Sequence, residues 1–340
     1  MVEITRIAVD TSKSVFTVHA VDAQARPVLR RNVRRQDLVT FFAKLAPAEV
    51  VMEACGGSHH WGRVLAGLGH RVRLIPAQYV KPFVKRGKND RNDAEAICEA
   101  AGRPGMRDVG IKSAESQGRA MLLSVRELLV RQRTQMVNAL RGHAAEMGLV
   151  AAQGDKGLAA LRAEIAGDAA LPKPAAEALQ LLGSEVDRIE ARLAEADKRL
   201  MAQLKADAAG RRLADIPGVG PMIALSFVLR VEATQFASGR HFAAWLGLVP
   251  REHSTGGKQR LGGISRAGNE RLRQLLVLGA TSVIRHAKPG RSGASAWLLA
   301  LLERKPRKLA AVALANKMAR VIWAMLTSGE TYRRQTPVAA

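Results

Sequence analysis

The order of apolar segments in the first hundred residues limits the possible folds more than any other feature of this chain. Three segments with alternating apolar residues, at 4–10, 15–21 and 27–33, are joined by short polar turns and predict an antiparallel meander. A helix is expected at 36–45. The apolar run V-V-M-E-A at 50–54, bounded by glycines, then predicts a buried strand.

The chain next alternates between helix and strand. A helix is predicted at 61–68, a strand at 71–75, a short helix at 79–84, and a further helix after the basic stretch that begins at residue 85. Three antiparallel strands followed by helix, strand, helix, strand and helix is the order of an RNase H-like fold. We therefore predict an α/β RNase H-like domain at the start of the chain.

Four acidic residues occupy distinctive places in this order. Asp10 ends the first predicted strand, Glu53 lies near the end of the fourth, and Asp90 and Asp93 lie three residues apart. If Asn89 or Asp90 begins a helix, as these residue types favour, Asp90 and Asp93 share one helix face. Ends of neighbouring central strands lie close together, so a helix packed across them can bring all four acids to one point.

Four carboxylates at one point repel each other unless a cation neutralises them. Two magnesium ions are the usual solution in phosphodiester chemistry, so we predict Mg²⁺ as the cofactor. Asp90 and Asp93 lie in the stretch K-R-G-K-N-D-R-N-D-A-E-A-I-C, where Lys85, Arg86, Lys88 and Arg91 suit a bound polyanion. The alternative is a polar helix start with solvated charges, because short motifs often match by chance.

The charge of the whole chain agrees with a polyanionic partner. The 340 residues carry a net charge of +23, which is typical of nucleic-acid-binding proteins. A membrane surface is the lesser alternative, because no basic amphipathic helix is evident at either end. Aromatic residues make up only 4%, so we expect contacts mainly with phosphates and with nucleic-acid shape.

Cysteine content and hydropathy give a cellular expectation. The two cysteines, Cys55 and Cys98, form no CxxC motif, which argues against a zinc module or a disulfide framework. We interpret both as small core residues in a reducing compartment. The sequence shows no signal peptide and no apolar run of membrane-spanning length, so we expect a cytoplasmic protein without membrane contact.

The middle of the chain predicts two long helices. The first, about 112–147, has an apolar stripe with an arginine-rich flank, and His143 is interpreted as a packed polar residue on that stripe. Residues 151–176, rich in Ala, Gly and Pro, are interpreted as a connector. The second helix, about 174–208, has near-heptad spacing that favours a coiled coil. It can fold back on the first helix or pair with another subunit, and we favour the second arrangement.

Residues 213–228, L-A-D-I-P-G-V-G-P-M-I-A-L-S-F-V, fit a helix-hairpin-helix pattern. Gly218 and Gly220 permit a tight turn, and Pro221 begins the next helix, whose free amides can hold a DNA phosphate. Such a contact is made to the backbone and carries no sequence information. The alternative is a tight turn used only for helix packing.

A basic, glycine-rich segment follows a predicted helix at 242–250. Residues 251–271 contain five glycines and five Lys or Arg residues, so we expect a surface loop that admits phosphate closely. Ser254 lies in this loop, and Lys258 and Arg260 are candidate nucleic-acid contacts. Composition alone leaves Ser254 as a solvated residue. Helices are predicted at 270–286, 295–302 and 306–326, followed by a polar tail from 331.

These motifs together resemble a known family over nearly the whole chain. They are A-V-D-T-S-K, V-M-E-A-C-G-G-S-H-H-W, K-N-D-R-N-D-A, I-P-G-V-G and L-G-L-V-P-R-E-H-S-T-G-G-K-Q-R-L-G-G-I-S-R-A-G-N. In this order they are similar to the IS-one-ten (IS110) insertion-sequence transposases. The H-S-T-G-G-K form is most similar to the IS-eleven-eleven (IS1111) branch of that family.

The resemblance implies a RuvC-like domain whose D-E-D-D set is Asp10, Glu53, Asp90 and Asp93, binding Mg²⁺. It implies that Ser254 is a nucleophile that forms a covalent phosphoserine link to DNA; the next position, often a second serine in the family, is Thr255 here. It also implies a circular intermediate and a bridge RNA, encoded by the element, that pairs with donor and target DNA. The assembly implied is a homo-oligomer, dimer to tetramer, in which the acids of one subunit meet the serine of another, inside a bacterial cell and at its nucleoid.

The domains expected are a RuvC-like domain at 1–108, long helices at 109–208, a transposase domain at 209–330 and a tail at 331–340. The function expected is a DNA transposase or recombinase with a phosphoserine intermediate, guided by RNA pairing. One rival is a metal-dependent RuvC-like junction nuclease that hydrolyses DNA with water and gives Ser254 no role. A second rival is a non-enzymatic nucleic-acid-binding protein with structural acids.

Overall fold

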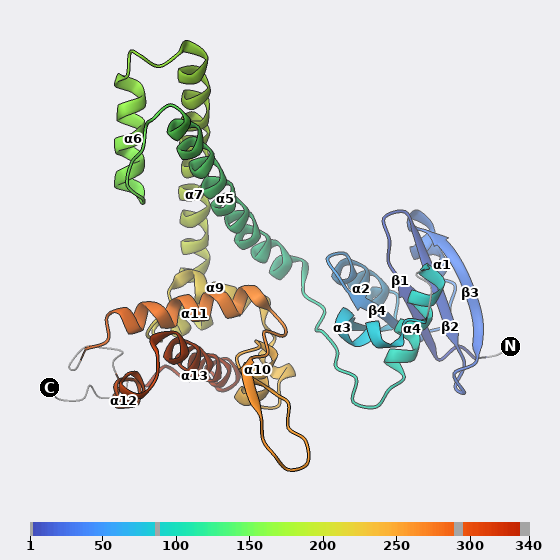
Figure 1. Ribbon diagram of the computed structural model, residues 1–340. Helices are drawn as coiled ribbons and strands as arrows, with labels where there is room; N and C mark the ends of the chain where they lie inside the picture. Colours follow the sequence, from blue (N-terminus) through green and yellow to red (C-terminus); the bar gives the residue numbers. More distant parts are fainter. Residues whose placement is uncertain (1–2, 86–88, 289–294, 334–340) are drawn as a thin grey trace. The chain divides into compact units, whose positions relative to one another are not determined.

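The computed structural model describes residues 3–85, 89–288 and 295–333 of the chain (Figure 1). Its contacts group the chain into two compact units, Met1–Gln117 and Gly118–Ala340. Each unit has its own hydrophobic core, and we describe them separately.

The first unit is built on a five-stranded mixed sheet. The strands are β1 (Arg6–Asp10), β2 (Val15–Val21), β3 (Pro27–Arg34), β4 (Glu49–Ala54) and β5 (Arg71–Pro76), in the spatial order β3-β2-β1-β4-β5. Pairs β1–β2 and β2–β3 are antiparallel, whereas β1–β4 and β4–β5 are parallel. All five strands lie where the sequence predicts them, and this mixed sheet is consistent with an RNase H-like domain.

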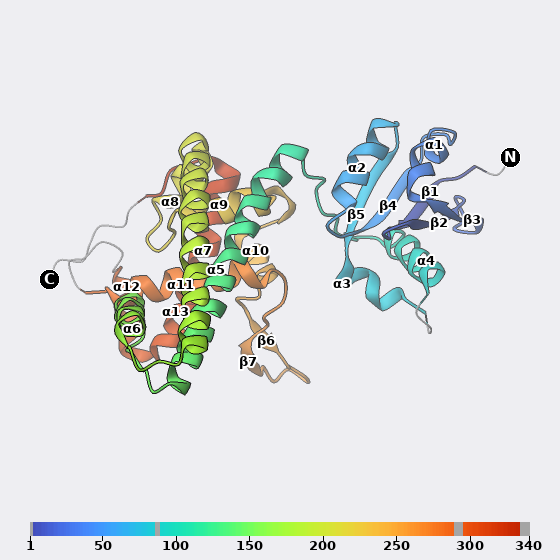
Figure 2. The ribbon, with the colours of Figure 1, turned by 90° about the horizontal axis from the view of Figure 1, so that it is seen from above.

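Helices cover both faces of this sheet (Figure 2). On one face Ile7, Val9 and Met52 pack with the short helix α1 (Leu38–Phe42) and with α2 (Ser58–Gly67). A 3₁₀ turn, η1 (Arg35–Asp37), precedes α1, so the helix predicted at 36–45 is shorter than expected. The edge-to-face pair of Phe16 and Trp61, with ring centroids 5.1 Å apart, joins sheet and helix in this core.

The other face carries the helices that follow β5. They are α3 (Ala77–Val80), the 3₁₀ turn η2 (Lys81–Phe83) and α4 (Asp90–Ala101). Ala8, Val51 and Ile75 pack against Ile97 and Ala100 of α4. Because side chains alternate along a strand, the odd and even residues of β1 serve the two different cores. Cys98 is buried in this second core as expected, but Cys55 is exposed, because it follows the end of β4.

Three helices form the extended part of the second unit: α5 (Ala114–Glu146), α6 (Asp155–Gly167) and α7 (Lys173–Ala206) (Figure 1). The interpretation of 151–176 as a connector was wrong for half of its length, because α6 lies inside it. Leu158 and Leu161 of α6 pack against Leu179 of α7. These two leucines give the alanine-rich segment a face to bury, which composition alone did not reveal.

Helix α7 contacts α5 of the same chain. Arg126 of α5 pairs with Asp197 of α7, and Arg133 Nε donates to Glu190 Oε1 at 2.7 Å. The arrangement we favoured, in which α7 pairs only with another subunit, is therefore not needed to explain its apolar spacing. The predicted apolar stripe of α5 included Val125 as well as His143, and it was partly wrong, because Val125 is 48% exposed and His143 is exposed beside Glu146.

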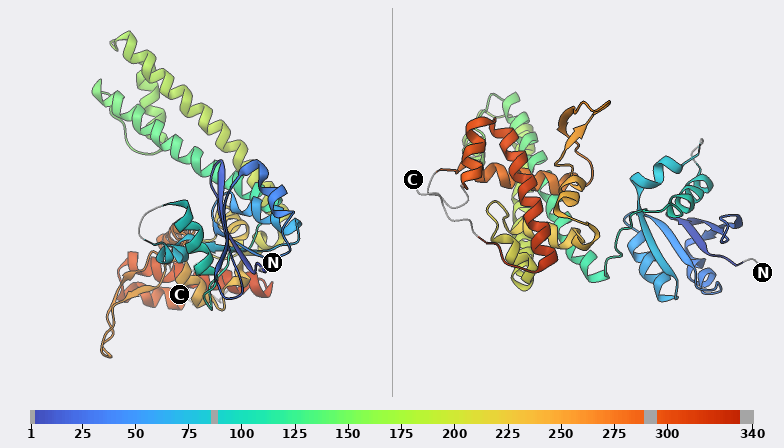
Figure 3. Two further views of the ribbon diagram at one scale, coloured as in Figure 1. Left: turned by 90° about the vertical axis from the view of Figure 1, so that its right-hand side faces the viewer. Right: turned by 90° about the horizontal axis from the view of Figure 1, so that it is seen from below.

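The rest of the second unit is a compact helical body. Its elements are α8 (Ala208–Ala214), α9 (Pro221–Arg230), η3 (Ala233–Gln235), α10 (Gly239–Trp245), α11 (Glu270–Arg285), α12 (Ala296–Arg304), α13 (Arg307–Ser328), β6 (Pro250–Glu252) and β7 (Leu261–Ile264). Phe227, Phe242 and Leu276 lie in its core and are fully buried. Strands β6 and β7 pair antiparallel and form a ribbon that projects from the helices of this unit (Figure 3).

Helix α13 corrects one expectation from the sequence. Its 22 residues, with a mean hydropathy of 1.5 in the most apolar window, make it long and apolar enough to cross a membrane. We interpret it as a core helix, because Ala315, Met318 and Ile322 are buried in the body of the second unit. Among the other helices that the structure describes, none of 18 residues or more meets the same test.

Candidate functional site

Two acids are positioned by the parallel strands β1 and β4. Val9 pairs with Met52, so the next residues, Asp10 at the end of β1 and Glu53 one residue before the end of β4, follow neighbouring positions of the two strands. Ala8 and Val51 face the core beneath α4, and side chains two residues apart on a strand share a face. Asp10 and Glu53 therefore project on the side of the sheet that α4 covers.

Helix α4 supplies the other two acids. Asn89 is its N-cap, since the Asn89 side chain accepts a hydrogen bond from the amide of Asn92 at 2.8 Å. Asp90 and Asp93 thus lie in the first turn, where the amide groups at the helix N-terminus favour negative charge. Local sequence and helix position agree, because asparagine is among the best N-cap residues.

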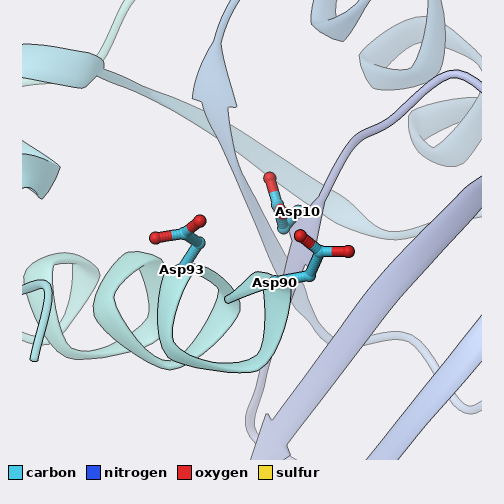
Figure 4. A group of neighbouring side chains, drawn as sticks. All are labelled: Asp10, Asp90 and Asp93. Carbon is cyan, nitrogen blue, oxygen red and sulfur yellow. The ribbon is translucent and has the colours of Figure 1, made fainter. Parts of the chain in front are cut away.

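The structure brings Asp10, Asp90 and Asp93 together (Figure 4). One carboxylate oxygen from each lies within 4.8 Å of the others, a spacing that one metal ion can bridge. Burial, followed by the charges of Asp93, Asp90 and Glu53, raises the pKa of Asp10 to about 6. Burial and then the charge of Asp93 also raise the pKa of Glu53, which lies beside the group of three.

The repulsion among these carboxylates favours the binding of a metal ion. Carboxylate oxygens are the ligands that Mg²⁺ prefers, and a bound cation would offset the repulsion that raises the pKa of Asp10. Asp10, Asp90 and Asp93 therefore fit a divalent ion by both ligand chemistry and charge, whereas Glu53 lies outside this group of three.

The predicted cations around the acids have different environments. Lys85 is engaged with Glu95 of α4, whereas Arg91 is exposed at the start of that helix. Arg91 also lines a small basic hollow of about 390 Å³ together with Thr17, Asn32 and residues of β2 and β3. Arg86 and Lys88 lie outside the residues that the structure describes.

Ser254 lies in the ribbon of the second unit, just after β6. Its hydroxyl donates to Glu252 Oε1 at 2.8 Å and accepts from the backbone amide of Arg260 at 3.1 Å. The segment predicted as a loop is thus partly ordered as a hairpin. Its side chains are exposed from Arg251 to Gly263.

The tip of the hairpin depends on glycine. Gly256 and Gly257 both have positive φ, at 55° and 76°, and the amide of Lys258 donates to the carbonyl of Thr255. Two central residues with positive φ are the mark of a type I′ turn, whose twist matches that of a β-ribbon. Lys258 and Arg260 consequently lie on the same exposed hairpin as Ser254.

The turn between α8 and α9 contains Gly218 and Gly220. Gly218 has φ +85°, and a Cβ there would lie 2.7 Å from the carbonyl oxygen of Gly279 on α11. Gly220 is exposed and begins α9, with open space around its Cα. Gly218 thus has a packing role, whereas Gly220 is the exposed N-cap of α9.

Comparisons with known proteins decide the family. Residues 210–294 match the family described as "Transposase IS116/IS110/IS902 family", and residues 7–148 match a second transposase family whose description names the DEDD set and IS110. A putative transposase of Sinorhizobium fredii is 51% identical over 98% of this chain and 86% of its own length. This chain belongs to the IS110 family of transposases.

Further members show how broad the similarity is. A probable family 20 transposase of Pseudomonas aeruginosa is 47% identical over 97% of this chain and 99% of its own length. The transposase for insertion sequence element IS1111A of Coxiella burnetii is 43% identical over 98% and 92% of the two chains. The resemblance found in the sequence is thereby confirmed, including its IS1111 branch.

Glu252 is a residue of this IS110-family chain to which the sequence assigned no role. In the structure its carboxylate accepts the hydrogen bond from the Ser254 hydroxyl. A signal was present, because Glu252 and Ser254 lie two residues apart, and side chains at that spacing in an extended chain face the same side.

Proposed function

We propose that this transposase cuts and rejoins DNA through two groups: a magnesium site formed by Asp10, Glu53, Asp90 and Asp93, and a serine nucleophile, Ser254. The observation that carries the proposal is the convergence of Asp10, Asp90 and Asp93, with ligand oxygens within 4.8 Å. Mg²⁺ bound there would neutralise phosphate charge and stabilise the attacking and leaving oxygens.

The serine step exchanges one phosphate ester bond for another and so conserves the free energy of the phosphodiester. Ser254 Oγ attacks a DNA phosphorus, an Oγ–P ester forms, and the bond between phosphorus and one deoxyribose oxygen breaks. The hydroxyl proton leaves Ser254, and the released deoxyribose oxygen takes up a proton. A second DNA hydroxyl can reverse the reaction on a new strand without an external energy source.

Glu252 is positioned to receive the proton of Ser254. Its Oε1 lies 2.8 Å from Oγ, within the range needed for direct proton transfer. The backbone amide of Arg260 donates a hydrogen bond to Ser254 Oγ and thereby orients the hydroxyl. Lys258 and Arg260 would hold the DNA phosphates near this serine, and Lys85, Arg86, Lys88 and Arg91 would do so near the acids.

The family resemblance supports a division of labour between protein and RNA. We propose that donor and target DNA are selected by pairing with a bridge RNA encoded by the element, while the net charge of +23 serves both nucleic acids. We also propose that the active form is a dimer or tetramer in which acids and serine from different subunits act on one phosphodiester. The exposed Gly220 turn would add contacts to the DNA backbone.

The test is a search for a covalent protein–DNA species. Full-length protein, element-derived RNA and both DNA sites are incubated with Mg²⁺, and the products are separated under denaturing conditions. We expect an adduct that is lost in Ser254→Ala and in Asp10→Asn but retained in Thr255→Ala, the matched neighbour.

Other outcomes point to the rivals. Cleavage that persists without an adduct in Ser254→Ala would identify a nuclease that uses water. If neither the wild-type protein nor any variant cleaves DNA in the presence of Mg²⁺, the protein is a nucleic-acid-binding protein without enzymatic activity. RNA sequencing of material copurified from cells that carry the element tests the guide, and absence of any RNA from the element contradicts it.

A further inference from the structure

A groove of about 1080 Å³ lies in the second unit, next to the β6–β7 ribbon that carries Ser254. One wall is a face of α13, and the other walls come from α12, from the start of α10 and from the ribbon itself. The ribbon contributes Pro250 of β6 and Gly262 and Gly263 of β7. The functions proposed above give this groove no role.

The face of α13 that lines the groove is long enough to bind several nucleotides of a DNA strand. Leu309, Val312, Asn316, Arg320 and Ala324 recur at helical spacing and form one continuous stripe in the groove. The stripe covers about 22 Å at 1.5 Å per residue, and the rise per nucleotide of a stacked DNA strand is about 3.4 Å. The groove therefore suits a short run of nucleotides better than one small molecule.

The charges of the groove are all positive. Arg240, Lys317 and Arg320 line it, no Asp or Glu does, and none of the three forms an ion pair with any residue in the described part of the chain. Three unneutralised cations around one groove attract an anionic ligand, and a phosphate backbone supplies evenly spaced negative charge.

The groove also offers a flat apolar surface. Trp297 is 40% exposed and Leu309 is 52% exposed, so each leaves apolar area open to water. The Lys317 ammonium lies 4.7 Å from the Trp297 ring centroid, which shows that this ring already accepts a cation on its face. An indole beside cations is the combination with which proteins stack unpaired bases while binding the phosphates.

The position of the groove connects it with Ser254. Ser254 follows Pro250 by four residues, about 13 Å along an extended chain, which is a few nucleotides of a single strand. We propose that this groove binds unpaired nucleotides of the DNA strand whose phosphate reaches Ser254, with one base stacked on Trp297 and phosphates on Arg240, Lys317 and Arg320. This proposal rests on the proposed role of Ser254.

The experiment uses single-stranded DNA from the element end, with the fluorescent base 2-aminopurine replacing one base at a time. Full-length Ser254→Ala protein is the titrant, so that binding is measured without chemistry. We expect strong quenching at one position a few nucleotides from the cut phosphate, and at least fivefold less quenching after the further change Trp297→Leu.

A second pair of variants tests the phosphate contacts. Arg320→Gln should weaken DNA binding several-fold and lower the slope of log affinity against log salt by about one. Lys308→Gln is the matched control, because Lys308 is an exposed cation of α13 outside the groove, and its effect should be smaller. Equal effects of the two substitutions would overturn the proposal.

The remaining outcomes separate this groove from the proposed function. If wild-type protein forms the adduct but no position is quenched, the groove proposal fails and the serine chemistry stands. If quenching occurs but no adduct forms, the groove still binds DNA and the serine mechanism fails. Tighter, Trp297-dependent binding of the corresponding RNA strand would make this an RNA site and overturn the proposal.

Discussion

The hydroxyl of Ser254 donates a hydrogen bond to the carboxylate of Glu252, with 2.8 Å between Oγ and Oε1. Both residues are exposed on the ribbon, so this contact is not a by-product of core packing. The amide of Arg260 completes the environment of the oxygen by donating to it. A serine held between a carboxylate and an amide donor is oriented before any DNA is bound.

Replacement of Glu252 tests whether this contact serves the reaction. In Glu252→Gln the amide oxygen can still accept the hydrogen bond, but it cannot take the proton. We expect adduct formation to slow by about 10²-fold, the lower end of general-base effects. DNA affinity, measured by filter binding, should change little. Glu270→Gln is the control, since the Glu270 carboxylate accepts from the Gln274 side chain at 3.1 Å and has no proposed part in the reaction, and this variant should react at the normal rate.

The acid cluster predicts that the metal-free protein loses stability as pH rises. The pKa of Asp10 is raised from its ordinary value of 3.8 to about 6. Its protonated form is favoured by folding, so this contribution is complete below about pH 4 and is lost as pH rises through about 6. Mg²⁺ should restore stability above that pH, which thermal unfolding with and without the ion can measure.

Asp93 should be the acid whose removal relieves most of the repulsion, because its charge acts on both Asp10 and Glu53. We expect Asp93→Asn to stabilise the metal-free protein by about 1 kcal/mol near neutral pH, a figure reduced for the partial exposure of Asp10. The same variant should lose the stabilisation by Mg²⁺. Glu99→Gln, an exposed acid of α4, should do neither.

The two turn glycines should respond differently to alanine. Gly218→Ala places a Cβ 2.7 Å from the Gly279 carbonyl oxygen at a positive φ, so we expect a loss of about 2–4 kcal/mol in stability. Gly220→Ala meets open space and should cost less than about 1 kcal/mol. Urea denaturation measures both. Comparable losses would show that the turn is not held by its contact with α11.

Glu127 joins three helices of the second unit. Its Oε1 accepts from Arg230 of α9 at 3.1 Å and from Arg271 of α11 at 3.0 Å, and its side chain is 15% exposed. We expect Glu127→Gln to destabilise the unit by about 2 kcal/mol, because two part-buried arginines lose their counter-charge. Glu195→Gln breaks an exposed pair with Arg199, which water screens, and should leave stability unchanged.

Much of the first unit could be predicted because its signals are local. The alternation in β1 and β2 and the apolar run of β4 are properties of short segments, and the Asn89 N-cap fixes where Asp90 and Asp93 fall on α4. The placement of Asp10 and Glu53 then follows from the parallel pairing of two strands that carry an acid at or next to their last residue.

The second unit was harder to predict because its helices have several possible partners. The buried face of α5 includes Leu123, Leu140 and Ala144, and which face is buried depends on where α7 and the helical body lie. Helix α6 was missed because two leucines decide its packing within an alanine-rich segment. The contact of Glu252 with Ser254 was missed because a charged residue in a short strand normally indicates only solvent exposure.

The serine hairpin buries almost nothing, and its shape depends on backbone hydrogen bonds and on two glycines at its tip. Substitutions elsewhere along it therefore leave the helical core intact. Loss of adduct formation after a substitution in this hairpin can therefore be assigned to the hairpin's own chemistry and not to unfolding of the unit.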